Sequence, residues 1–170
     1  MGDFHGEPTR VLENQFIQLE YLANSARIVR FSLKGKNNLF ADLKKEPVQT
    51  PYGKFHFRGG HRLWHAPEAM PRTYIPDNEG AMIEDIPNGV RIEMPAEAWT
   101  HIAKSIEIRL NPDRPQAIVQ HELRNGGAWA VEFAPWALTM FRLSGVGIFP
   151  QPVGNTDEAG LLSNRQLILW

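Results

Sequence analysis

The chain has 170 residues, of which 42% are hydrophobic, and it has no cysteine and a formal net charge of −1. This length and composition predict one globular domain with a buried core. A net charge so close to zero gives no electrostatic basis for binding nucleic acid or an anionic membrane surface. The lack of cysteine excludes disulfides, a thiol nucleophile and a zinc–thiolate site.

The N-terminal residues lack the apolar core of a signal peptide. No apolar run approaches the roughly 18 residues that a membrane span needs, so we expect a soluble protein, and a cytoplasmic location fits the absence of cysteine. Residues 1–13 are polar and are predicted to be a flexible lead-in. Residues 14–170 are predicted to form a single β-sandwich domain.

Alternating apolar and polar residues predict β-strands along most of the chain. In the first of them, Ile17, Leu19 and Tyr21 alternate with Gln18 and Glu20. An Asn-Gly pair at 88–89 lies between two further alternating runs, which is a strong hairpin signal. The predicted strands are 15–22, 27–34, 82–86, 90–94, 100–110, 116–125, 129–143 (interrupted at Pro135) and 164–170, and 37–42 is a candidate short strand.

No window shows an apolar helical stripe of ten residues. Repeated hairpins at this spacing predict an all-β protein, an antiparallel sandwich or barrel. The last strand, Leu-Ile-Leu-Trp, stops without a polar tail. Because an open apolar edge favours aggregation, we expect either that the sheet continues beyond Trp170 or that self-association through exposed sheet edges completes it.

The segment Arg58–Glu68 (Arg-Gly-Gly-His-Arg-Leu-Trp-His-Ala-Pro-Glu) has the densest set of functional side chains. Its glycines and proline predict a loop that turns these side chains toward a common point. Sugars are bound by an aromatic platform together with polar groups that bond to hydroxyls. The candidate sugar-binding residues are therefore Arg58, His61, Arg62, Trp64, His65 and Glu68. In the alternative interpretation Trp64 anchors the loop in the core, and Arg62 and Glu68 form a surface ion pair of little energetic consequence.

A metal site is a second interpretation of the same segment. The His-x₃-His-x₂-Glu spacing of His61, His65 and Glu68 would place all three on one side of a helix. Pro67 and the preceding Gly-Gly argue against a helix, and the His-x-His of the cupin jelly rolls is absent. A metal-dependent jelly-roll enzyme is therefore kept as an alternative, and the leading hypothesis includes no metal and no cofactor.

Two residues outside this segment are also candidates. His121 lies on the apolar face of its predicted strand, where it is either a core or cleft residue or, if that face is open, a group for proton transfer near neutral pH. Pro135 inside a strand implies an edge or a bulge, which would re-aim Trp136. Trp136 is then either a second sugar platform or a core residue.

Several short motifs resemble one known superfamily. Arg58-Gly59-Gly60, followed by Trp64 and Pro67, resembles the Arg-Gly-Gly…Trp-Pro loop of the glucose-6-phosphate 1-epimerase branch of the galactose-mutarotase-like superfamily. Asn125-Gly126, Ala134-Pro135-Trp136 and Asn164–Trp170 are similar to segments of uncharacterised bacterial members. The resemblance implies a large antiparallel β supersandwich that binds a hexose on its concave face. It also implies a His acid and a Glu base that open and reclose the sugar ring at C1.

Two departures from the family pattern bear on activity. Trp136 stands where the family places its catalytic His, and the family's catalytic Glu lies in a later part of a longer domain. We therefore predict a carbohydrate-binding β-sandwich whose ligand is a sugar or a sugar phosphate. If it is an epimerase, His121 is the acid–base candidate and Arg58 the substrate clamp. The remaining alternative is a non-catalytic sandwich whose edges serve oligomerisation.

Overall fold

The computed structural model describes residues 1–43, 46–148, 154 and 157–159. These residues are almost entirely β and include no α-helix; the one helical turn is the 3₁₀ turn η1, Arg72–Tyr74. No helix among them is long and apolar enough to cross a membrane. The strands are β1 Gly2–Phe4, β2 Glu7–Glu13, β3 Ile17–Leu22, β4 Arg27–Leu33, β5 Asp42–Leu43, β6 Val48–Thr50, β7 Gly53–Phe55, β8 Arg58–Ala66, β9 Met82–Ile86, β10 Gly89–Glu93, β11 Ile102–Leu110, β12 Ala117–Asn125 and β13 Ala134–Met140.

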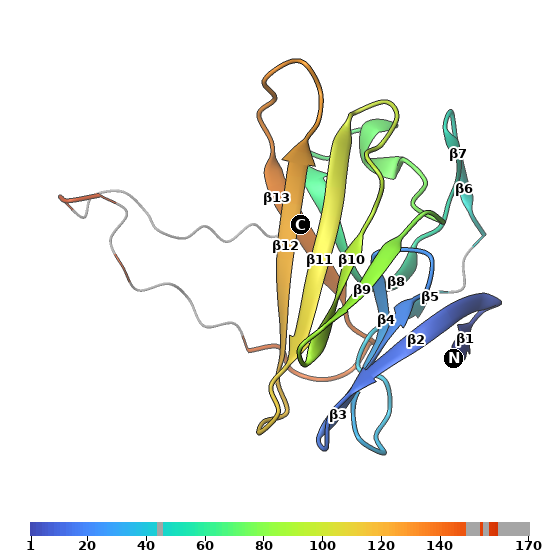
Figure 1. Cartoon of the computed structure of the whole chain (residues 1–170), viewed down its shortest axis with the longest axis vertical. Coiled ribbons are helices and arrows are strands. Elements are labelled where there is room, and N and C mark those ends of the chain that lie inside the picture. Colours follow the sequence, from blue (N-terminus) through green and yellow to red (C-terminus); the bar gives the residue numbers. More distant parts are fainter. Residues whose placement is uncertain (44–45, 149–153, 155–156, 160–170) are drawn as a thin grey trace.

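The strands form two main antiparallel sheets. The larger has the order β1-β2-β3-β4-β8-β13, with β5 paired to β8, and the smaller has the order β12-β11-β10-β9. Figure 1 shows the smaller sheet lying across β4, β8 and β13 of the larger one. The hairpin β6–β7 stands apart from both sheets. The predicted all-β, antiparallel architecture is therefore confirmed at the level of two packed sheets.

A shared apolar core joins the two sheets. Leu19, Ile28 and Leu63 of the larger sheet belong to the same buried cluster as Ile92 and Ile106 of the smaller one. Each is at most 5% exposed, and full burial of such a side chain stabilises the fold by roughly 1.5–3 kcal/mol. The period-two pattern in the sequence predicted the core face correctly for Leu19, Ile92 and Ile106, because successive side chains of a strand point to opposite sides. Leu63 lies in the segment for which the sequence predicted a loop.

The prediction for residues 1–13 is wrong. These residues form β1 and β2, and β2 pairs with β3 in register from Thr9↔Leu22 to Glu13↔Gln18. Phe4 is 1% exposed and packs with Leu22 and Val29. A polar segment joins the fold here because backbone hydrogen bonds to a neighbouring strand do not require apolar side chains.

The prediction of a loop at 58–68 is also wrong over most of its length. Residues 58–66 form β8, which pairs with β4, β5 and β13 and has eight consecutive buried residues. Gly59 and Gly60 have positive φ values of 79° and 62°. A Cβ atom on them would lie 2.3 Å from the Ala41 carbonyl oxygen and 2.1 Å from that of Ile28. The glycines therefore allow neighbouring backbone to approach β8 closely.

The strand observed near the end of the described chain agrees in part with the prediction from the sequence. Strand β13 covers Ala134–Met140, within the predicted 129–143, and lies at the end of the larger sheet. Pro135 is thus on an edge strand, where a residue without an N–H group is tolerated. The predicted strand 164–170, and with it the predicted apolar edge, lies outside the described residues.

We predict that Gly60→Ala lowers the free energy of unfolding by more than about 3 kcal/mol, because its Cβ would overlap a backbone oxygen in a left-handed conformation. Gly35→Ala is the matched control: φ is +70°, but no atom lies within 4 Å of the added Cβ. Gly35→Ala should lower the free energy of unfolding by only about 1–2 kcal/mol. Urea unfolding of both variants measures the difference, and equal losses would contradict the close approach at Gly60.

Candidate functional site: a cleft at Arg62

Successive side chains of β8 point to opposite faces of the larger sheet, so the predicted site residues are divided between these two faces. Leu63 belongs to the core between the sheets, and His61 and His65 share its side of the strand. Arg62 and Trp64 therefore point to the opposite, outer face. The neighbouring strand β13 follows the same pattern, because Trp136 lies directly opposite Trp64 in the register.

The outer face carries a cleft of about 260 Å³ between β8, β13 and η1. The Trp64 ring centroid lies 5.2 Å from that of Trp136 and 5.2 Å from that of Tyr74, both edge to face. We call this the Arg62 cleft. The lining residues used below are Phe57, Arg62, Trp64, Glu68, Tyr74 and Trp136. Four of them, Arg62, Trp64, Glu68 and Trp136, were predicted from the sequence to bind a ligand.

Arg62 is a buried cation without a hydrogen-bond acceptor among the described residues. It is 5% exposed, and its guanidinium carbon lies 3.6 Å from the Trp64 ring centroid and 4.7 Å from that of Phe55. Its three nitrogens make no hydrogen bond within the described chain, and neither does the buried Nε1 of Trp64. Burial, followed by the charge of Arg27, lowers the pKa of Arg62, yet an arginine keeps its proton in proteins. Charged and neutral N–H donors therefore lie buried in the wall of the cleft without an acceptor among the described residues.

The neighbouring arginines are fully paired. Arg27 donates from Nε and Nη2 to the two Asp77 oxygens at 2.6 and 2.8 Å. Arg58 donates to both Glu7 oxygens at 2.7 Å and to Asn78 Oδ1 at 2.9 Å. Burial alone would raise the pKa of Asp77, but the charge and hydrogen bonds of Arg27 hold it well below its usual range. Arg58, predicted as a substrate clamp, is thus engaged in joining β8 to the N-terminal strands.

The two candidate histidines His61 and His121 meet between the sheets. Their Nε2 atoms are 2.8 Å apart, and His61 Nδ1 lies 2.7 Å from Thr139 Oγ1. Burial, and then the neighbouring His121, lowers the pKa of His61 to about 4, and burial lowers the pKa of His121. Both rings are therefore neutral near pH 7 and share an N–H···N hydrogen bond. This pair lies on the opposite side of the β8 backbone from Arg62.

The remaining candidates have separate partners. His65 Nε2 lies 3.5 Å from a Glu97 carboxylate oxygen, which is too long for a strong hydrogen bond. Glu68 accepts a hydrogen bond from the Tyr74 hydroxyl at the rim of the Arg62 cleft. His61, His65 and Glu68 therefore do not converge, and the described residues include no group of three or more His, Cys, Asp or Glu placed to hold a metal ion. The geometry does not support the metal-enzyme alternative.

Tyr74 and Phe57 line the cleft but were not singled out from the sequence. Tyr74 comes from η1, which lies outside the strands and the site segment predicted from the sequence. Its ring packs edge to face against those of Phe55 and Trp64. These contacts join a turn to two different strands, so the periodicity of a single strand or helix could not have indicated them.

No protein-family model, curated protein or solved structure matches this chain. The resemblance to the galactose-mutarotase-like superfamily is therefore a resemblance of the short motifs described above. The function has to be inferred from the geometry and charge of the clefts.

We predict that Arg62→Met leaves the free energy of unfolding unchanged or raises it by about 1–4 kcal/mol, because it removes a buried charge that has no ion-pair partner. Arg27→Met should instead lower it by about 3–5 kcal/mol, since Asp77 loses its bidentate partner. Urea unfolding at pH 7 compares the two variants. A loss for Arg62→Met as large as that for Arg27→Met would show that Arg62 stabilises the fold.

We predict that the His61–His121 pair makes the free energy of unfolding decrease as the pH is lowered from 6.5 toward 4. The unfolded chain binds a proton at His61 near pH 6.5, whereas the folded chain binds it near pH 4. The stabilising contribution is thus complete above pH 6.5 and is lost as the pH falls toward 4, on the order of 3 kcal/mol. His61→Gln keeps a hydrogen-bonding group without this titration. Unfolding curves at both pH values should show a smaller loss for the variant, and equal losses would contradict the assignment.

Proposed function

We propose that the protein binds an anionic carbohydrate, a sugar phosphate or a sugar acid, in the Arg62 cleft. The observation that carries this proposal is the set of buried donor nitrogens, three on Arg62 and one on Trp64, that have no acceptor within the described chain. A buried cation without a partner is costly. An anionic ligand group supplies the missing acceptors.

The chemistry of the cleft suits such a ligand. A guanidinium binds phosphate or carboxylate through two parallel hydrogen bonds, and these are stronger where water is excluded. Trp136 and Tyr74 are only partly buried, so their rings can receive the C–H face of a sugar. The Glu68 carboxylate at the rim can accept hydrogen bonds from sugar hydroxyls.

Membership of the galactose-mutarotase-like superfamily, with its supersandwich fold and epimerase activity, is part of the same proposal and is supported by the motif resemblance. Ring opening and closure need an acid and a base beside the sugar ring. In the Arg62 cleft the ionisable pair is Tyr74 and Glu68, whereas His121 lies across the sheet. Binding is therefore the function that the geometry supports best. Self-association through sheet edges and a cytoplasmic location remain predictions from the sequence.

Isothermal titration calorimetry with D-glucose 6-phosphate, D-glucuronate and D-glucose tests the proposal. We expect at least one of the two anions to bind more tightly than D-glucose. Arg62→Met should weaken that binding at least about thirtyfold, equivalent to about 2 kcal/mol.

Arg109→Met is the control, because Arg109 pairs with Glu107 on the surface of the smaller sheet. It should bind the anions as the wild type does. Failure of both anions to bind, or equal binding by wild type and Arg62→Met, would rule out the proposal.

A further inference from the structure

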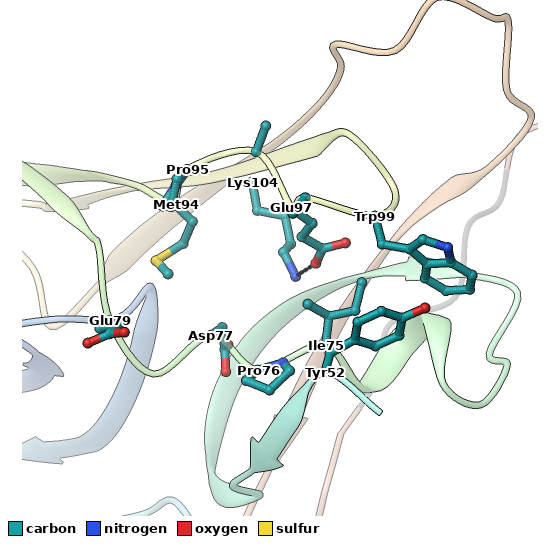
Figure 2. A pocket seen from close by; sticks show the side chains of 12 residues that line it. Tyr52, Ile75, Pro76, Asp77, Glu79, Met94, Pro95, Glu97, Trp99 and Lys104 are labelled. Carbon is teal, nitrogen blue, oxygen red and sulfur yellow. Dashed lines mark ion pairs between the residues drawn. The ribbon is translucent and has the colours of Figure 1, made fainter. Parts of the chain in front are cut away.

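A second and larger cleft lies on another part of the molecule. It has a volume of about 530 Å³ and lies between the β6–β7 hairpin, the segment after η1 and the connection from β10 to β11. We call it the Trp99 cleft; the residues that matter below are Tyr52, Asp77, Glu79, Glu97, Trp99 and Lys104 (Figure 2). Its volume falls within the roughly 300–1,000 Å³ typical of small-molecule sites.

Two partly exposed aromatic rings form one end of this cleft. Tyr52 and Trp99 are stacked, with centroids 5.0 Å apart and planes inclined at 27°. They come from separate segments and are 41% and 49% exposed. Packing against the protein therefore covers only part of the apolar surface of each ring. The remaining ring surface is available for contact with a ligand.

A buried ion pair supplies the polar groups of the cleft. Lys104 and Glu97 are each 8% exposed at the side chain, and the Lys104 ammonium contacts a Glu97 oxygen. Burial would raise the pKa of Glu97, but the His65 ring beside it and the charge of Lys104 lower it to about 2. Figure 2 shows both charged ends directed into the cleft, between Asp77 and Trp99. The cleft thus presents a fixed N–H donor beside a fixed carboxylate acceptor.

The charges of the cleft select against ions. Its ionisable lining is Asp77, Glu79 and Glu97 against the single cation Lys104, so an anion would be repelled. A cation beside the ion pair would be repelled by the Lys104 ammonium. The Glu97 and Asp77 charges are already balanced by Lys104 and by Arg27. An uncharged ligand with hydroxyl groups suits a balanced donor–acceptor pair.

We propose that the Trp99 cleft is a second binding site, separate from the Arg62 cleft, that takes an uncharged pyranose. The sugar's C–H surface contacts the Tyr52–Trp99 rings. One of its hydroxyl oxygens accepts from the Lys104 ammonium, and a hydroxyl donates to the Glu97 carboxylate. This site does not depend on Arg62, and its ligand class differs from that of the Arg62 cleft in charge.

Tryptophan fluorescence titration and calorimetry with methyl β-D-glucopyranoside and methyl β-D-galactopyranoside test this inference, since both sugars are uncharged and fixed as pyranoses. We expect at least one to bind the wild type, and Trp99→Ala to weaken it roughly tenfold, or about 1.4 kcal/mol. The matched control is Trp129→Ala, because Trp129 is 83% exposed and lies outside the cleft. Its affinity should equal that of the wild type.

A double variant, Lys104→Met with Glu97→Gln, removes both charges together and so leaves no buried charge unpaired; it should also lose affinity. Arg62→Met should bind the methyl glycosides normally, which separates this inference from the proposed function. Absence of glycoside binding, or binding that Arg62→Met abolishes and Trp99→Ala retains, would overturn the inference. A Trp99-dependent site that prefers D-glucose 6-phosphate or tetramethylammonium would overturn it as well.

Discussion

Burial of β8 on both faces is the constraint on which the rest of the structure depends. The strand lies between β4 and β13, and its Gly59 and Gly60 allow backbone to pass too close for any Cβ atom. With neighbours on each edge and side chains packed on each face, its alternating residues enter two different environments. The inner environment pairs His61 with His121, and the outer one holds Arg62 against Trp64.

The arginines show how charge is distributed over this frame. Arg27 and Arg58 have carboxylate partners that are 50 and 51 residues away in sequence, so they join distant segments while remaining buried. Arg62 lies near both but has no such partner among the described residues. In the Trp99 cleft, by contrast, Lys104 pairs with Glu97, and Asp77 pairs with Arg27. A cleft with an unpaired cation and a cleft with paired charges suit two different ligand classes.

The sequence predicted those strands whose register depends on local information. The β9–β10 hairpin forms around Pro87 and Asn88, where Asn88 has a φ of 57°, and the alternation of Ile106 and Ile108 placed the core face of β11 correctly. The predictions for residues 2–13 and 58–66 were both wrong, and one physical reason explains both. Polar or Gly-containing segments lack apolar periodicity, and only pairing with neighbouring strands makes them extended.

The sequence by itself determined the all-β class, the main hairpins and four residues of the Arg62 cleft. The tertiary structure decided which of the candidates share a face, because Arg62 and His61 are adjacent in sequence but lie on opposite sides of β8. It also decided which charges are paired, since the partners of Arg27 and Arg58 come from remote segments. Composition and spacing determine which groups a chain has, whereas pairing and burial depend on contacts between distant residues. Those contacts leave Arg62 as the unpaired buried cation of the described chain around which the function is proposed.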